Sequence, residues 1–262
     1  MIQAEHLTKR YRDKTAVNDV TLSVHVGETV VLLGGSGSGK TTTLKMLNRL
    51  IEPTDGEVWL DGTNTTQVPP HELRRRIGYV FQQVGLFPHM TVSENIGVTP
   101  KLLKWSPNRI LARIEELLSL LDLEKSLLER QPHELSGGQQ QRVGVARALA
   151  AHPDVMLLDE PFGALDQITR ERLQDSYLRI RKTLSLTSIF VTHDIGEAIT
   201  LGDRIGVMHH GRLLQLASPS ELVANPANNY VRELMNSPRR QAARVEALSS
   251  NTDKDWADQP NG

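Results

Sequence analysis

Cysteine is absent from this chain of 262 residues, and so is any marked excess of one charge. The lack of cysteine excludes disulfides, thiolate zinc sites and cysteine-ligated iron–sulfur clusters, and it suits a reducing compartment. The 30 basic and 31 acidic side chains give a formal net charge of −1, and both signs are mixed along the sequence. Because there is no basic stripe, the composition argues against a nucleic acid partner.

Long apolar runs are missing as well. No run approaches the roughly 20 residues that a membrane-spanning helix needs. The first residues, 1–5, have neither the basic region nor the apolar region of a secretory signal. With 39% hydrophobic residues, the chain can still build a sizeable core. We therefore expect a folded protein that stays in the cytosol unless a partner holds it at a membrane.

Residues 34–41 read GGSGSGKT and fit the phosphate-binding loop pattern G-x-x-x-x-G-K-[ST]. The run 29–33 before them is typical of a strand, and 42–50 after them is typical of a helix. Four glycines predict a backbone that curls with positive φ and turns its N–H groups toward a polyphosphate. Lys40 would reach the β- and γ-phosphates, and Thr41 would ligate Mg²⁺. An ordinary turn before a helix is the alternative. The residues predicted to bind a nucleotide here are Gly34, Gly35, Ser36, Gly37, Ser38, Gly39, Lys40, Thr41 and Thr42.

A strand that ends in two carboxylates is the second part of the expected site. The wholly apolar run 155–158 is followed by Asp159 and Glu160. A buried strand that stops there places Asp159 where it can hold Mg²⁺ or its waters, opposite Thr41. Glu160 faces a different direction and can orient or deprotonate an attacking water. The alternative is a strand that ends in two solvated acids.

A capped helix is the third part. Residues 135–139 read LSGGQ and precede a stretch with apolar positions at Val143, Ala146 and Leu149. Ser136 is a natural N-cap, and the glycines after it let backbone N–H groups approach an anion closely. By itself this pattern also fits an ordinary capped loop.

The periodicity of apolar residues divides the chain into parts. It predicts a β-rich start, then a helical insert at about 83–154 in which Ser106 caps a helix that begins at Pro107. From residue 155, strands alternate with helices, which predicts a parallel sheet with both faces covered. The expected strands are 2–7, 20–26, 29–33, 57–60, 77–81, 155–158, 188–192 and 205–208, and the later helices are 169–184 and 194–201.

The three motifs together resemble those of the ATP-binding cassette (ABC) proteins, and the resemblance covers nearly everything from Ile2 to about Met235. Within that family the chain is most similar to the subunits that power importers of osmoprotectants, quaternary amines such as glycine betaine, choline and carnitine. It departs from common family patterns at Gly35, Gln167 and Gly196, but none of these positions carries a reacting group. The stretches that carry the closer similarity are 44–50, 85–92, 104–106, 162–166 and 225–228.

The resemblance implies an α/β fold, an ABC-type P-loop NTPase with a RecA-like core, an N-terminal antiparallel β subdomain and a helical subdomain. One nucleotide-binding domain would span 1–236, with the helical subdomain at about 83–154. A polar tail with little periodicity, 237–262, would follow and be loosely ordered. Many relatives continue into paired CBS domains, which we do not expect here.

The resemblance also assigns roles to single residues. Gln82 corresponds to the Q-loop glutamine, which reaches Mg²⁺ and the attacking water, and His193 to the switch histidine, which contacts the γ-phosphate. Tyr11 resembles the aromatic that stacks on adenine, and Asp166 lies in a stretch that resembles the D-loop at the dimer seam. Read alone, these would be a surface glutamine, a solvated histidine, a strand aromatic and a loop acid. The signature residues that would bind the γ-phosphate held by a second copy are Ser136, Gly137, Gly138 and Gln139.

The implied protein is an ATPase that uses ATP and Mg²⁺ and forms a head-to-tail dimer with a second copy of itself. It would drive integral membrane permease subunits at the cytoplasmic face of the plasma membrane, as a peripheral subunit. In the family, those subunits insert a short helix into a groove beside the Q-loop, for which Leu86, Phe87 and Pro88 are candidates. An extracytoplasmic substrate-binding protein would be an indirect partner, and nucleic acid would be no partner.

Two other functions stay open at this point. An importer of a sugar, a polyamine or an amino acid would share every catalytic residue. A soluble ABC ATPase of DNA repair, chromosome organisation or translation usually has a long coiled coil, zinc-binding cysteines or two cassettes. Here there is one cassette and no cysteine, and the stretch between Lys40 and Leu135 is too short for a long coiled coil.

Overall fold

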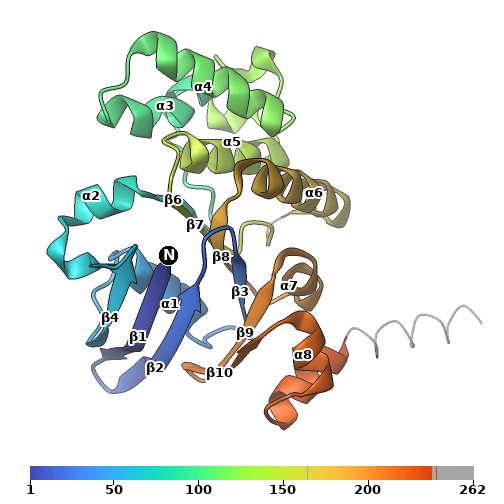
Figure 1. Cartoon of the computed structure of the whole chain (residues 1–262). Helices are drawn as coiled ribbons and strands as arrows, with labels where there is room; N and C mark the ends of the chain where they lie inside the picture. The colour runs from blue at the N-terminus through green and yellow to red at the C-terminus, as the bar shows by residue number, and fades with distance from the viewer. Residues whose placement is uncertain (164, 238–239, 241–262) are drawn as a thin grey trace, which may run out of the picture.

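The computed structural model describes residues 1–163, 165–237 and 240 (Figure 1). The chain begins with an antiparallel sheet of strand order β2-β1-β4-β5. β1 and β2 are longer than the runs that predicted them, because the register of their pairing shifts three times between Ala4 and Arg10. Such shifts break the alternation of apolar and polar residues from which a strand is predicted. The strands are β1 (Ile2–Tyr11), β2 (Lys14–Val24), β4 (Asp55–Leu60) and β5 (Thr63–Asn64).

A second sheet of six strands, in the order β10-β9-β3-β8-β7-β6, forms the centre of the molecule. All neighbours are parallel except β10, which runs antiparallel to β9. The predicted parallel sheet is therefore confirmed. β10 was not predicted, because its sequence has neither alternation nor an unbroken apolar run. The strands are β3 (Thr29–Leu33), β6 (Ile77–Val80), β7 (Val155–Asp159), β8 (Thr187–Thr192), β9 (Arg204–His209) and β10 (Arg212–Ala217).

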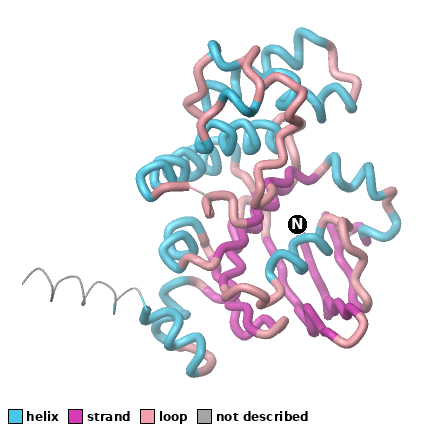
Figure 2. The backbone as a smooth tube through the Cα atoms, turned by 180° about the vertical axis from the view of Figure 1, so that it is seen from behind, coloured by secondary structure: helices cyan, strands magenta, loops and turns pink. Residues whose placement is uncertain are grey.

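The central sheet is covered on both faces, which explains why its inner strands are apolar throughout. Every residue of β3 is buried. Val30 and Leu32 belong to the core between the two sheets, which also contains α1 (Lys40–Leu47). Val31 and Leu33 belong to the core on the other face, with α6 (Gln167–Leu184) and α7 (Ile195–Leu201). Figures 1 and 2 show this layering from opposite sides.

A helical part lies at the top of Figure 1 and consists of α3 (Val92–Leu102), α4 (Pro107–Leu120) and α5 (Gly137–Leu149). The predicted helix at Pro107 is confirmed with Ser106 at its N-cap position, but the Ser106 side chain makes no capping hydrogen bond. α3 lies within the predicted helical insert but was not predicted as a separate helix, and it contains Pro100, a residue that usually ends a helix. A signal was nevertheless present, since Thr91 and Glu94 form a capping box at its start.

The remaining helices are short. The helix predicted at 42–50 is α1, which begins two residues earlier and ends at Leu47. α2 (Pro70–Arg75) and α8 (Pro219–Ala224) were not predicted. None of the helices in the described ranges is long and apolar enough to span a bilayer. The predicted α/β class, with its antiparallel start and helical part, is confirmed.

Candidate nucleotide site

The phosphate loop connects β3 to α1, as predicted, but its glycines are needed for different reasons. Only Gly37 and Gly39 have positive φ, at 75° and 103°. Gly34 is required because a Cβ there would lie 2.3 Å from the carbonyl oxygen of Met208, on β9. Gly35 has neither constraint, since a Cβ would meet nothing within 4 Å. The expectation that all four glycines curl the backbone through positive φ is therefore wrong for two of them.

These differences predict unequal effects of two identical substitutions. Gly39→Ala should lower the free energy of unfolding by about 2 kcal/mol or more, because left-handed backbone disfavours a Cβ and this Cβ would also meet the carbonyl of Ala16 at 2.7 Å. Gly35→Ala should stay within about 0.5 kcal/mol of the wild type. Chemical denaturation without nucleotide measures both. Equal losses of stability would contradict this account of the loop.

The side chain of Lys40 lies inside the curl of the loop. It is 4% exposed, and its Nζ donates to the carbonyl oxygens of Gly34 at 2.7 Å and Gly35 at 3.0 Å. Burial lowers the pKa of Lys40, while the nearby charge of Glu160, 3.9 Å from Nζ, acts in the opposite direction. A cation is thus held where the loop would cradle an anion.

A cavity of about 270 Å³ lies over the loop. It brings together part of the predicted site, namely the residues from Ser36 through Thr42 with Gln82 and Glu160. It also contains Lys14 and Ala16 from the start of β2, which no sequence signal indicated. Tyr11 is not part of the lining, although it pairs with Lys14 across the β1–β2 hairpin and is 45% exposed.

Asp159 ends β7 beside the loop. Its Oδ1 accepts a hydrogen bond from the hydroxyl of Thr41 at 2.7 Å, and its Oδ2 accepts one from Tyr79 at 3.3 Å. The side chain is 3% exposed, and within the described ranges no basic nitrogen lies within 4 Å of it. Burial raises the pKa of Asp159. Its two hydrogen-bond donors are neutral hydroxyls, while the charge of Lys45 acts on it from a greater distance. Carboxylate and hydroxyl oxygens are ligands that Mg²⁺ prefers.

Glu160 gathers three of the predicted residues around one carboxylate. Its Oε2 accepts from Gln82 Nε2 at 3.4 Å and lies 3.2 Å from His193 Nδ1, while Oε1 lies 3.9 Å from Lys40 Nζ. The backbone explains its direction, because φ at Glu160 is 44° and its N–H is bound to the carbonyl of Val191 on β8. Ends of parallel strands meet at one edge of a sheet, so residues distant in sequence converge here.

The LSGGQ stretch lies elsewhere, as does Asp166. Ser136 caps α5 through a capping box with Gln139 and is exposed. Asp166 is exposed and caps α6 by accepting from the N–H of Thr169, and this hydrogen bond lowers its pKa. A Cβ at Gly138 would meet Thr169 at 2.7 Å, so the two helix starts pack together. None of the residues 136–139 lines the cavity over the loop.

The sequence pattern of the ABC transporter family matches residues 17–163, which is more than half of the chain. The chain belongs to the ABC transporter family. This membership and the cavity agree, because the matched region contains the phosphate loop, Gln82 and the residues that end β7.

Two relatives of this ABC protein are informative. The chain is 52% identical over 240 residues to the "Glycine betaine/carnitine/choline transport ATP-binding protein OpuCA" of Bacillus subtilis (strain 168), covering 91% of this chain and 63% of that protein. It is 52% identical over 233 residues to the "Glycine betaine uptake system ATP-binding protein YehX" of Escherichia coli (strain K12), covering 89% and 76%. The chain spans about three fifths of the length of the OpuCA proteins of Bacillus subtilis (63%) and Listeria monocytogenes (60%).

A solved structure with the same fold is the dimeric cassette MJ0796, described as a bacterial ABC transporter cassette. It is 36% identical, with a TM-score of 0.76, and the match covers 83% of this chain and 98% of that one. The same cassette was solved in a post-hydrolysis state bound to ADP and Pi, at 35% identity and a TM-score of 0.75. The ABC-type fold predicted from the motifs is confirmed.

Proposed function

We propose that this chain is the ATP-hydrolysing subunit of an ABC importer for osmoprotectants such as glycine betaine, choline or carnitine. The observation that carries the proposal is the convergence of Gln82, His193 and Lys40 on the carboxylate of Glu160, beside a phosphate loop. The osmoprotectant substrate rests on the names of the relatives alone, because residues that bind ATP carry no information about the imported solute.

In this proposal the loop binds the phosphates of ATP, and Lys40 moves from its carbonyl partners to the β- and γ-phosphate oxygens. Glu160 orients a water against the γ-phosphorus and takes its proton, while the bond to the bridging oxygen breaks and ADP leaves. His193 and Gln82 hold the phosphate and the water in place. Tyr11, which pairs with Lys14 across the β1–β2 hairpin, would stack on the adenine.

Thr41, Asp159 and Gln82 would hold Mg²⁺, and a buried carboxylate without a basic partner fits that ion. When bound, Mg²⁺ neutralises charge that develops on the phosphate oxygens. The chain's own contribution is to fix the direction of the carboxylate through the hydroxyls of Thr41 and Tyr79.

Two copies would form the complete site, each with its LSGGQ stretch against the phosphate loop of the other. The exposed position of Ser136, away from the cavity of its own chain, supports this arrangement, and the similar cassette MJ0796 is dimeric. Asp166 would lie at the seam between the copies. We assign the nucleotide-binding domain to 1–236 and its helical subdomain to 83–154. In the predicted tail, 237–262, residues 238–239 and 241–262 lie outside the described residues.

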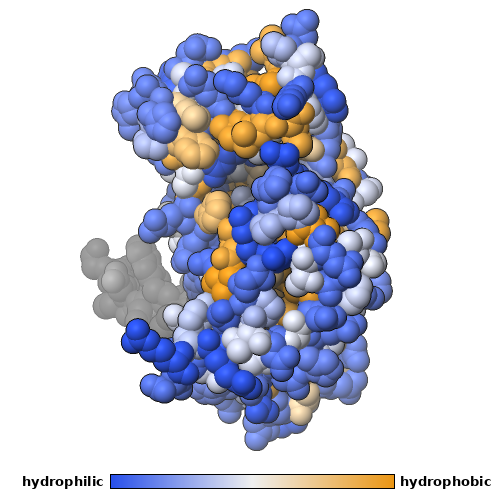
Figure 3. All heavy atoms as spheres, turned by 90° about the vertical axis from the view of Figure 1, so that its left-hand side faces the viewer, coloured by the Kyte–Doolittle hydropathy of each residue, from blue (hydrophilic) through white to orange (hydrophobic). Residues whose placement is uncertain are grey.

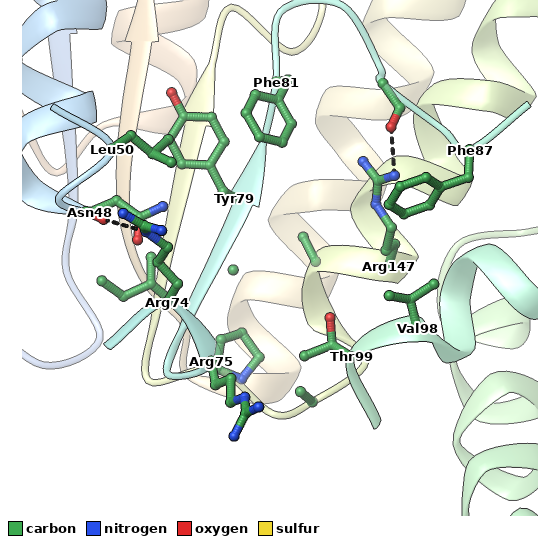
Figure 4. Close-up of a pocket in the computed structure, with 16 residues that line it drawn as sticks. Asn48, Leu50, Arg74, Arg75, Tyr79, Phe81, Phe87, Val98, Thr99 and Arg147 are labelled. Carbon is green, nitrogen blue, oxygen red and sulfur yellow. Dashed lines mark hydrogen bonds between the residues drawn. The ribbon is translucent and has the colours of Figure 1, made fainter. Parts of the chain in front are cut away.

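A groove between β6 and the helical part would receive the permease. It has a volume of about 290 Å³, and Leu50, Phe81 and Phe87 line it with each about 40% exposed. Figure 4 shows these side chains around the groove, and Figure 3 shows apolar residues beside a hollow next to the helical part. Contiguous exposed apolar side chains mark interaction sites. Of the three predicted candidates, Phe87 lines the groove, whereas Leu86 packs against the core and Pro88 is exposed outside the lining.

The permease would hold this subunit at the cytoplasmic face of the plasma membrane. The extracytoplasmic substrate-binding protein would contact the permease and not this chain. We see no role for nucleic acid.

Solute uptake in cells deleted for this gene tests the proposal. The cells should lose most of their uptake of labelled glycine betaine, choline or carnitine, and keep their uptake of maltose and spermidine. Expression of the wild type should restore uptake, and Lys40→Ala should not. Loss of maltose or spermidine uptake, with uptake of the quaternary amines intact, would contradict the substrate class.

A further inference from the structure

One side chain forms part of both the groove and the candidate metal site. Tyr79 lines the groove, where its ring lies 4.5 Å from the ring of Phe81 (Figure 4). Its hydroxyl donates to Oδ2 of Asp159 at 3.3 Å. The sheet explains this double contact: Tyr79 on β6 pairs with Leu157 on β7, and Asp159 is the next residue on the same face of β7. Such diagonal neighbours are within reach of a long aromatic side chain.

The hydroxyl acts as a donor. An ionised carboxylate can only accept hydrogen bonds, so the phenol O–H is the donor in its contact with Oδ2 of Asp159. Thr41 occupies the other oxygen of Asp159. The two hydroxyls together fix the plane of a carboxylate that is otherwise buried without a basic partner. Outer partners of this kind orient a metal ligand and are nearly as important as the ligand itself.

The ring faces the groove, on the side where a partner would dock. In Figure 4 it lies beside Leu50 and Phe81, which are both 40% exposed. A molecule that fills the groove and covers these apolar side chains must therefore press against the ring of Tyr79. A shift of the ring moves the hydroxyl, because the two are parts of one rigid group.

We propose that Tyr79 is a positioning residue that holds the Asp159 carboxylate for Mg²⁺ and links occupation of the groove to that carboxylate. The inference rests on the proposed function. It adds that a single side chain, that of Tyr79, directly connects the docking groove with the metal ligand Asp159. This path is separate from Gln82, which contacts Glu160 and lies in the segment after β6.

The first test is the Mg²⁺ dependence of nucleotide binding, measured by calorimetry with the non-hydrolysable analogue AMP-PNP. Tyr79→Phe keeps the ring and removes only the hydroxyl, and it should raise the Mg²⁺ concentration for half-maximal binding about tenfold. Binding in EDTA and the melting temperature should stay at wild-type values. Tyr230→Phe, the same chemical change on a tyrosine that stacks on His209, should leave the Mg²⁺ dependence unchanged.

The outcomes are distinguishable from failure of the proposed function. If Asp159→Asn leaves the Mg²⁺ dependence unchanged, the proposed metal site itself is wrong. The positioning role is overturned if Asp159→Asn raises the Mg²⁺ concentration for half-maximal binding but Tyr79→Phe changes that concentration by less than a factor of about two. Substitutions of residues that orient a metal ligand typically have larger effects than that. The double variant should show no further loss beyond Asp159→Asn.

The second test fills the groove artificially. The chain has no cysteine, so Leu50→Cys provides a single thiol, beside Tyr79, for modification with N-benzylmaleimide. The modification should change the Mg²⁺ dependence of AMP-PNP binding about fivefold, the lower end of typical coupling between sites. In the Tyr79→Phe background the change should vanish. Leu111→Cys, exposed on α4 and outside the groove, is the labelled control.

Only one pattern supports the link between groove and metal site. The link is overturned if labelling the Leu50→Cys variant causes no change in the Mg²⁺ dependence. It is also overturned if the change persists in the Tyr79→Phe background, or if labelling the Leu111→Cys variant causes an equal change.

Discussion

Glu160→Gln should lower ATP turnover by about 10² to 10⁴, the range typical of losing a general base. The amide keeps the size of the side chain and can still bond to Gln82 and His193, which lie 3.4 and 3.2 Å from Oε2 in the wild type. It cannot accept the proton of the attacking water. ATP binding should survive, because the phosphate loop and Lys40 are unchanged. Steady-state ATPase rates and nucleotide titration measure the two effects separately.

The same substitution should also stabilise a dimer. Glu160→Gln removes one negative charge beside each γ-phosphate and prevents the reaction that reopens the site. ATP with Mg²⁺ should convert the variant into a stable dimer on a sizing column, whereas the wild type should dimerise only transiently. Asp159→Asn is the matched control, since it changes the neighbouring acid to its amide but should weaken Mg²⁺ and give no stable dimer. Hydrolysis by Glu160→Gln at the wild-type rate would rule out Glu160 as the base.

The chemistry of the site could be predicted from sequence because its residues follow strands. Asp159, Glu160 and His193 each come directly after, or at the end of, an apolar run that could only be a buried strand. Parallel strands align their carboxyl ends, so convergence on the loop followed from the fold class. The individual contacts of Glu160 with Gln82, His193 and Lys40 were not predicted, and only the structure shows them.

Other features depend on packing that no local pattern records. Lys14 and Ala16 reach the cavity only because the first sheet lies against the loop, where the Cβ of residue 39 would meet the carbonyl of Ala16. The requirement for glycine at position 34 also comes from a residue distant in sequence, because a Cβ there would collide with a backbone carbonyl on β9. The contact of Tyr79 with Asp159 depends on the register between β6 and β7. Register is set by the whole sheet, so a single strand sequence does not contain it.

The helical part shows the opposite case, in which a local signal for a helix was present in the sequence but was not used. The capping box of Thr91 and Glu94 indicates the start of α3. This region lies inside the predicted helical insert 83–154, but no separate helix was predicted there, and Pro100 within α3 disfavours one locally. Tertiary packing resolves the conflict, because α3 buries Val92 and Ile96 against the helical core. Long-range burial can thus outweigh the cost of a proline inside a helix.

The composite site can be tested through Ser136, which lies at the start of α5 and outside the cavity of its own chain. In the Glu160→Gln background, Ser136→Arg should abolish the ATP-dependent dimer, because a long side chain would occupy the space of the partner's phosphate. Losing the cap costs only about 1 kcal/mol, so each copy should remain folded. Circular dichroism and a sizing column measure the two properties.

Ser126→Arg is the control for Ser136→Arg. It shows whether loss of the dimer comes from obstruction of the partner's phosphate or from the added positive charge alone. Ser126 is also exposed and lies in the same stretch between α4 and α5, but it does not precede a helix that would face a second copy. The Glu160→Gln dimer should therefore tolerate Ser126→Arg. ATP binding to the monomer should be normal in both arginine variants, because the phosphate loop belongs to the other half of each site. A dimer that forms equally well with either arginine would show that the two copies do not meet through the LSGGQ stretch, and the head-to-tail arrangement would have to be abandoned.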